Sequence, residues 1–158
     1  MEDTEESTQY TTDPKDLLHM REAINQANLS IAIPTAYCVG AVLTSKDGAV
    51  LSTGFSRELP GNTHAEECAL TKVSGDPTAA RGGTMYTTME PCSLRLSGNR
   101  PCVERILEAG IARVVMGVRE PPNFVQCNGV DLLREKGVKV CVVPGVEEDC
   151  LKPNRHVL

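Results

Sequence analysis

The second half of the chain alternates between strand-like and helix-like segments, and this alternation constrains the fold more than any other feature. Strands are predicted at 84–89, 111–118 and 138–143, and helices at 101–109 and 128–136 lie between them. Strands separated by single helices run parallel, are joined by right-handed crossovers and have helices on their faces. The later half therefore predicts an α/β unit.

The first half adds an antiparallel pair of strands. Strand-like patterns at 37–43 and 49–55 flank Lys46-Asp47-Gly48. An Asp-Gly pair supplies the positive φ that a tight hairpin turn requires. The expected fold is therefore a three-layer α/β/α arrangement around one mixed, five-stranded sheet.

Helix signals and local composition indicate the domain organisation. One helix is predicted at 13–28, because Asp13-Pro14 supplies an N-cap followed by proline at the first helical position. A second helix is predicted at 64–73. Residues 1–12 are polar and poor in apolar side chains, which predicts a mobile tail. The remaining 13–158 is expected to form a single domain, since a chain of 158 residues builds one core.

Composition also bears on the compartment. No apolar run approaches membrane-spanning length, and the chain starts with the acidic segment 1–6 where a secretory signal would be basic and then apolar. The seven cysteines are an odd number and need not pair in a reducing compartment. These features predict a cytoplasmic protein with no membrane segment.

The net charge argues against nucleic acid as a partner. It is −5 at pH 7, with an isoelectric point near 5.2, whereas proteins that follow a phosphodiester backbone are usually basic. Two Phe, three Tyr and no Trp leave few surfaces on which splayed bases could stack. Nucleic-acid binding is therefore not expected.

Two short motifs and one further cysteine predict a metal centre. They are Thr63-His64-Ala65-Glu66, Glu90-Pro91-Cys92, and Cys102. Catalytic zinc typically takes three His and Cys ligands and keeps one position open for water. The ligands expected for one Zn²⁺ per subunit are His64, Cys92 and Cys102. The order His-x-Glu, Pro-Cys, Cys is the pattern of zinc-dependent base deaminases, in which the Glu, here Glu66, transfers protons and does not bind the metal.

Each of these assignments has a simpler alternative. Thr63-x-x-Glu66 also fits a capping box, in which the carboxylate only closes the start of a helix. Cys68 lies one helical turn after His64 and could complete a closed, structural zinc site. We favour the catalytic interpretation because a cap does not account for the cysteines.

The run from Met85 to Cys102, MYTTMEPCSLRLSGNRPC, resembles the riboflavin-biosynthesis deaminases of the cytidine-deaminase-like superfamily, and most closely their fungal type. The resemblance extends from about Val39 to Val143. It implies a cytidine-deaminase-like fold and a homodimer. It also implies a phosphorylated ribitylaminopyrimidine as substrate, 2,5-diamino-6-ribitylamino-4(3H)-pyrimidinone 5′-phosphate, whose 2-amino group is removed by hydrolysis with release of ammonia.

The spacing of the cysteines indicates where the substrate binds. Nine residues separate Cys92 from Cys102, where many nucleobase deaminases have two, so the intervening segment is expected to loop out beside the metal. Such a loop, next to a helix N-terminus, can bind phosphate, although a solvated surface loop would have the same composition. The candidate substrate-binding residues are Asn62, Glu90, Arg95, Ser97, Asn99, Arg100 and Asn123. Asn62 and Asn123 could instead only shape turns.

Two other functions remain open on the sequence. The chain could deaminate a nucleobase or nucleoside, such as cytidine, guanine or a tRNA base. It could also be a non-catalytic module stabilised by structural zinc.

Overall fold

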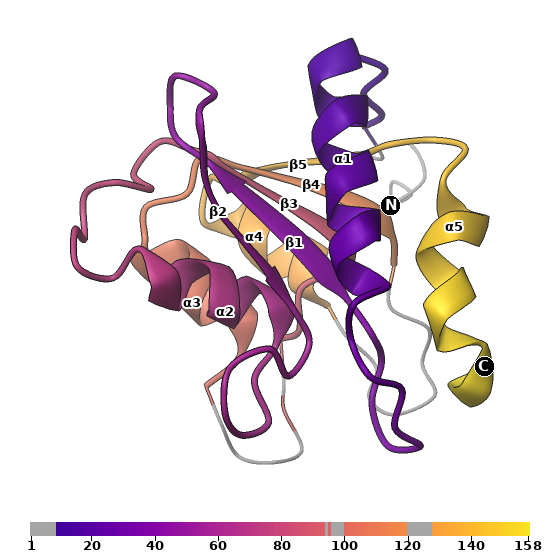
Figure 1. Ribbon diagram of the computed structural model, residues 1–158. Helices are drawn as coiled ribbons and strands as arrows, with labels where there is room; N and C mark the ends of the chain where they lie inside the picture. The colour runs from indigo at the N-terminus through magenta and orange to yellow at the C-terminus, as the bar shows by residue number, and fades with distance from the viewer. Residues whose placement is uncertain (1–8, 94, 96–99, 120–127) are drawn as a thin grey trace.

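The computed structural model describes residues 9–93, 95, 100–119 and 128–158, and within them one mixed five-stranded sheet lies between two layers of helices (Figure 1). The strands run in the order β2-β1-β3-β4-β5. β1 pairs antiparallel with both β2 and β3, whereas β3, β4 and β5 are parallel. The strand bounds are β1 Gly40–Thr44, β2 Val50–Phe55, β3 Thr84–Met89, β4 Arg113–Val118 and β5 Lys139–Val142.

The helices divide between the two faces of this sheet. On one face lie α2 (Ala65–Lys72), α3 (Cys102–Glu108) and α4 (Gly129–Glu135), and on the other lie α1 (Pro14–Ala27) and α5 (Glu147–Leu151) (Figure 1). A short 3₁₀ segment, η2 (Lys152–Val157), follows α5. The predicted three-layer arrangement is confirmed. No helix among the described residues combines the length and apolar character needed to cross a membrane.

Two hydrophobic clusters fill the spaces between the layers. Successive residues of a strand point to opposite faces, so β3 and β4 contribute to both clusters. Met85 and Val114 pack toward α2, α3 and α4, whereas Tyr86 and Val115 pack toward α1 and α5. The central strands are buried on both sides, which is why they contain almost no charged residues.

The beginning of the described chain differs from the prediction of a mobile tail over 1–12. The Val142 N–H donates to the Gln9 carbonyl at 2.8 Å, and the Thr11 N–H donates to the Val142 carbonyl at 3.0 Å. Residues 9–11 therefore cover the outer edge of β5. The prediction of a mobile tail does not hold for residues 9–11, because their partner is a strand more than a hundred residues away, which no local pattern reveals. Residues 1–8 lie outside the described residues.

A buried carboxylate joins α1 to the sheet. Asp16 is 3% exposed and accepts hydrogen bonds from the Tyr86 hydroxyl at 2.8 Å, the Thr11 hydroxyl at 2.6 Å and two nitrogens of Arg113. Burial would raise the pKa of Asp16, but the hydrogen bonds from Arg113, Thr11 and Tyr86 outweigh it and lower the pKa to about 2. The ionised side chain therefore stabilises the packing of α1 on β3 and β4.

Replacing Asp16 with Asn should destabilise the fold by about 1–3 kcal/mol, because the Arg113 guanidinium loses its charged partner. Urea unfolding of D16N and the parent protein measures this difference. The matched control is D149N, which removes the Asp–Arg pair between α1 and α5, that of Arg21 and Asp149, where both side chains are about half exposed. Exposed pairs contribute little, so D149N should unfold like the parent.

The difference in the free energy of unfolding between the parent protein and D16N should also depend on pH. The pKa of Asp16 in the folded state, about 2, lies below its ordinary value of 3.8. The stabilisation is therefore complete above about pH 5 and is lost as the pH falls toward 2. An unchanged difference between pH 6 and pH 3 would contradict this account of Asp16.

Candidate metal centre and proton-transfer site

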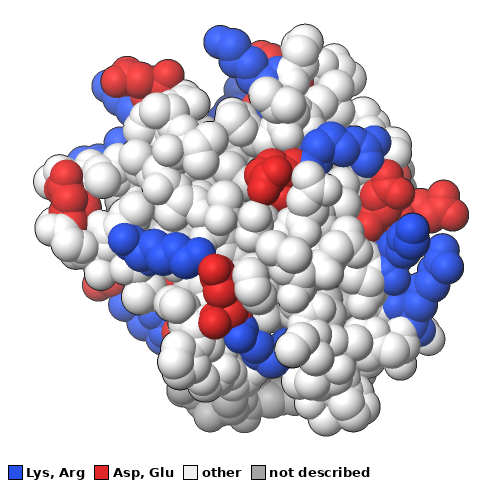
Figure 2. Space-filling view, viewed as in Figure 1, with Lys and Arg blue, Asp and Glu red and all other residues white. Residues whose placement is uncertain are grey.

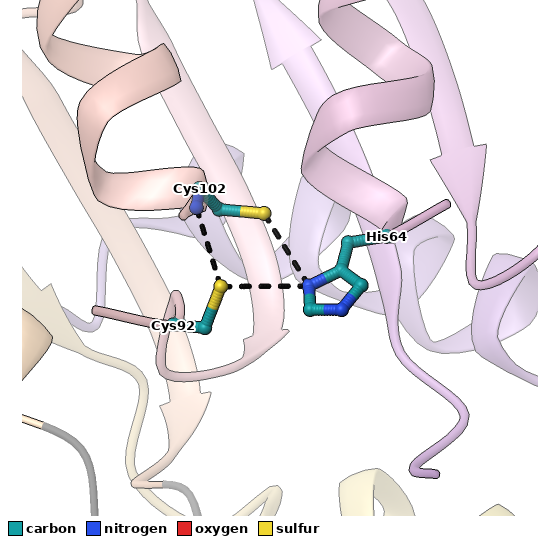
Figure 3. A group of neighbouring side chains, drawn as sticks. All are labelled: His64, Cys92 and Cys102. Atoms are coloured by element: carbon teal, nitrogen blue, oxygen red, sulfur yellow. Dashed lines mark hydrogen bonds between the residues drawn. The ribbon is translucent and has the colours of Figure 1, made fainter. Parts of the chain in front are cut away.

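Three side chains from different elements converge at one end of the sheet (Figure 3). His64 is the residue before the first turn of α2, Cys92 follows the end of β3, and Cys102 is the first residue of α3. The Nδ1 atom of His64 lies 3.5 Å from the Sγ atoms of both cysteines. The tertiary structure thus brings the three predicted metal ligands together.

The distances within this trio fit zinc. Zinc–nitrogen bonds of about 2.0–2.1 Å and zinc–sulfur bonds of about 2.3 Å, at a tetrahedral angle, give a nitrogen–sulfur separation of about 3.6 Å. Both nitrogen–sulfur separations here are 3.5 Å. One imidazole and two thiolates are also the donor set that zinc favours. Three ligands leave a fourth tetrahedral position without a protein ligand from the described chain.

The local environment favours a thiolate at Cys92. The Cys102 thiol hydrogen-bonds to it and lowers its pKa, and His64 acts in the same direction. The backbone N–H of Cys102, at the start of α3, also donates to the Cys92 sulfur at 3.2 Å. The hydrogen bond with Cys92, together with burial, raises the pKa of the Cys102 thiol. Zinc binds thiolates, so a zinc ion held here would displace the thiol protons.

Glu66 lies buried beside the trio, on the first turn of α2. It is 3% exposed, and its Oε2 atom lies 3.0 Å from the Thr87 hydroxyl on β3. Burial raises the pKa of the Glu66 carboxyl above its ordinary value. The carboxyl is close enough to interact electrostatically with His64 and Cys92. It does not belong to the group of potential ligands, so it is available to accept and donate protons.

The capping alternative for Glu66 is wrong, because its neighbour closes the helix. The Glu67 carboxylate accepts the backbone N–H of His64 at 3.2 Å. The Thr63 hydroxyl, which a Thr63-x-x-Glu66 box would direct to the Glu66 amide, donates instead to the Leu59 carbonyl at 2.9 Å. Consecutive helical residues point about 100° apart, so only one of the two glutamates can fold back on the helix start.

Cys68 does not complete a fourfold protein site. Among the described residues, the only group of potential ligands with mutually close donor atoms contains His64, Cys92 and Cys102. Cys68 is fully buried between α2 and β2, where its Cβ atom lies near Gly54. It packs as a small apolar side chain.

The two arginines of the predicted phosphate-binding loop contact groups of this chain. Arg95 has a buried side chain that pairs with Glu67 at 3.0 Å. Arg100 pairs with Glu104 and Glu108 along the surface of α3. Arg95 is therefore held by a carboxylate of α2, and Arg100 by two carboxylates of α3, the helix that follows it. Both arginines stay predicted phosphate-binding residues, and each has carboxylate partners in the folded protein.

The other predicted substrate-binding residues lie in different settings. Asn62 is exposed just before α2, and its carbonyl accepts from Arg95. Glu90 is buried, and its Oε2 atom accepts the backbone N–H of Val130 on α4 at 3.3 Å. Ser97, Asn99 and Asn123 lie outside the described residues.

Sequence reasoning missed two polar residues at the centre. Glu67 accepts the backbone N–H at the start of α2, a role that the Thr63-x-x-Glu66 motif assigned to Glu66. Thr87, on β3, contacts the Glu66 carboxyl. Glu67 was detectable as a second carboxylate in the first turn of α2. Thr87 offered no signal, because one threonine in a β-rich run is ordinary.

The charged side chains on the face drawn in Figure 2 are interspersed. Lys and Arg alternate there with Asp and Glu, and they form no continuous basic surface on the visible described residues of that face. The ion pairs of Lys72 with Glu58 and of Arg100 with Glu104 and Glu108 reflect the same mixing of signs. This face therefore lacks the electrostatic footprint of a nucleic-acid-binding surface.

Residues 13–118 match the model of the cytidine and deoxycytidylate deaminase zinc-binding region. The chain is 46% identical over 136 residues to a diaminohydroxyphosphoribosylamino-pyrimidine deaminase of Schizosaccharomyces pombe. That alignment covers 85% of this chain and 33% of the relative. The chain thus spans about a third of the length of the curated relatives it matches.

Solved structures give the same result for the fold. The Rib2 deaminase of Aspergillus oryzae, in complex with DARIPP, superposes with a TM-score of 0.76 at 34% identity, covering 87% of this chain and 88% of that one. A Thermotoga maritima diaminohydroxyphosphoribosylaminopyrimidine deaminase/5-amino-6-(5-phosphoribosylamino)uracil reductase superposes with a TM-score of 0.75 at 33% identity. This superposition covers 87% of this chain and 38% of that one. The predicted cytidine-deaminase-like fold is confirmed.

Zinc content tests the ligand assignment. The purified protein should contain one zinc per chain, and Cys92→Ala or Cys102→Ala should remove it, because two remaining ligands hold zinc poorly. Cys68→Ala is the matched control and should keep the metal. Elemental analysis after gel filtration measures all four proteins. Loss of zinc from C68A, with retention in C92A, would contradict the assignment.

Proposed function

Because the chain belongs to the cytidine and deoxycytidylate deaminase family, we propose that it is a zinc-dependent deaminase of riboflavin biosynthesis. Its substrate is 2,5-diamino-6-ribitylamino-4(3H)-pyrimidinone 5′-phosphate. Water replaces the 2-amino group, so that a carbonyl forms at ring C2 and ammonia leaves. The ribosyl form of this compound is the second candidate, because the names of relatives contain phosphoribosylamino.

The observation that carries this proposal is a buried carboxylate, Glu66, beside three residues with zinc-ligand geometry. A structural zinc site does not require such a group, since burying a carboxylate without a cationic partner is costly. Proton transfer, by contrast, requires a carboxyl that does not bind the metal. The likeness to the Schizosaccharomyces and Aspergillus deaminases supports the pyrimidine as the substrate class.

The chain's own residues account for the proton transfers. Zinc, when bound by His64, Cys92 and Cys102, supplies a Lewis acid that lowers the pKa of water toward about 7. Glu66 takes the proton of the attacking water and delivers it to a ring nitrogen as the new C2–O bond forms. It then takes the proton of the new C2 hydroxyl and passes it to the amine, so that the C2–N bond breaks, a carbonyl remains at C2 and ammonia leaves. The Thr87 hydroxyl, 3.0 Å from Glu66 Oε2, orients the carboxyl during these steps.

The phosphate is assigned to the spacer between Cys92 and Cys102. Within this spacer Arg95 pairs with Glu67 of α2, and the sequence also places the polar residues Ser97 and Asn99 there. Asn62, Glu90 and Asn123 remain candidates for the pyrimidine and its polyol chain. Arg100 reaches a phosphate only by leaving Glu104 and Glu108, so it is the weakest member of the predicted set.

Two further properties belong to the same proposal. The family resemblance favours a homodimer with one zinc in each subunit. A cytoplasmic location agrees with the six cysteines of the described chain, all of which have free thiols. Sedimentation measures the first property and fractionation of cells measures the second.

Glu66→Gln should lower turnover of the ribityl substrate by at least about 100-fold while zinc content stays at the parent level. The amide keeps the shape of the carboxyl but cannot take a proton from water. Glu58→Gln is the control, because Glu58 pairs with Lys72 at the far end of α2. Ammonia release measures activity in all three proteins. Turnover within a few-fold of the parent would remove Glu66 from the mechanism.

A substrate panel separates the candidate functions. The parent protein should release ammonia from the ribityl or ribosyl pyrimidine phosphate and not from cytidine, guanine or tRNA. Unphosphorylated ribityl compound should react with a higher KM, since the phosphate contacts are missing. Release from a nucleoside alone would favour the alternative deaminase. Release from no compound, with zinc tightly held, would favour the structural module.

A further inference from the structure

The Glu67 carboxylate contacts three parts of the chain near the predicted metal ligands. Its Oε1 atom accepts the backbone N–H of the ligand His64 at 3.2 Å and the Arg95 Nη1 at 3.0 Å. Its Oε2 atom lies 3.3 Å from Arg105 Nη2. Arg105 belongs to α3, the helix that begins with the ligand Cys102. One side chain therefore joins the start of α2 to α3 and to the spacer.

The Arg95 guanidinium completes this set of connections. It donates to the carbonyl of Asn62, two residues before His64, and to the carbonyl of Arg100, two residues before Cys102. Arg95 itself lies three residues after Cys92. The side chains of Glu67 and Arg95 thus contact or belong to residues that lie within three positions of each predicted ligand.

The pair is shielded from solvent. The Arg95 side chain is 2% exposed and that of Glu67 is 16% exposed. Burying two charges costs free energy that their attraction only partly offsets, so such a pair is a weak source of stability. A helix cap alone would also need no buried arginine, since many exposed polar residues can cap a helix. The contacts themselves indicate a positional role.

We propose that the Glu67–Arg95 ion pair positions the metal ligands by setting the separation of the three segments that carry them. The pair does not touch the ligand atoms; it acts through the backbone at His64, near Cys92 and before Cys102. The consequence is slow release of zinc from the folded protein. This inference rests on the zinc site and not on the identity of the substrate.

Zinc release tests the proposal without any measurement of catalysis. The zinc-loaded protein is mixed with excess of a chromogenic chelator, and the rate of metal transfer is recorded. Glu67→Gln keeps the size of the side chain but removes its charge, and we expect release about 10–100-fold faster than in the parent, the usual effect of losing an outer partner of a metal site. Unfolding temperatures of the metal-free proteins are measured alongside.

The control is Glu58→Gln, which removes a carboxylate of the same type from the ion pair with Lys72 on the same helix. This variant should release zinc at the parent rate. If Glu67→Gln lowers the unfolding temperature of the metal-free protein and leaves zinc release unchanged, the pair is only structural and the proposal is wrong.

Arg95→Lys provides an independent variant. It keeps a positive charge opposite Glu67 but cannot reach the carbonyls of Asn62 and Arg100 together, so zinc release should again be faster. If the two side chains act as one unit, the double variant should accelerate release by less than the product of the single effects. An acceleration of zinc release equal to the product of the two single effects would show that the two side chains act separately, against the proposal. If neither single variant folds, the pair serves the fold itself, and a specific role at the metal site is wrong.

Discussion

The close approach of α2 to the sheet at Gly54 is the constraint on which the metal centre depends. A Cβ atom at Gly54 would lie 2.3 Å from the carbonyl of Ala65, so no other residue allows α2 to lie at this depth. That depth brings His64 to the end of β3, where Cys92 follows the strand. A similar contact at Gly129, where a Cβ would meet the Pro91 carbonyl at 2.3 Å, sets α4 against the Glu90-Pro91-Cys92 turn.

Two consecutive glutamates on α2 have different roles because a helix turns by about 100° per residue. Glu66 points into the interior, where burial and the Thr87 hydroxyl surround its carboxyl. Glu67 points along the helix start, where it accepts the His64 amide and pairs with Arg95 and Arg105. The start of α2 thus carries the predicted metal ligand His64, the proposed proton-transfer group Glu66 and the Glu67 side chain that joins this helix start to Arg95 and α3.

The arginines between the metal-binding cysteines illustrate a limit of composition-based reasoning. A loop with Arg95 and Arg100 predicts phosphate binding, because free guanidinium groups bind phosphate well. In the folded protein both cations have carboxylate partners from elements outside the loop itself. Which cation is free depends on where distant carboxylates lie, and the sequence of the loop contains no information about that.

The sequence by itself determined the order of elements and the mixed sheet, and it singled out the three predicted metal ligands that the fold brings together. Hydrophobic periodicity, the Asp-Gly pair and Asp13-Pro14 are local signals of strands, turns and helix starts. The motif of His64, Glu66, Cys92 and Cys102 can likewise be read from the sequence without knowledge of the fold. Only the tertiary structure decided that Glu67 and not Glu66 closes α2, that Cys68 lies apart from the three predicted ligands, and that residues 9–11 pair with β5. These outcomes depend on contacts between residues distant in sequence, where packing and the pairing of buried charges select one partner among several that local chemistry allows.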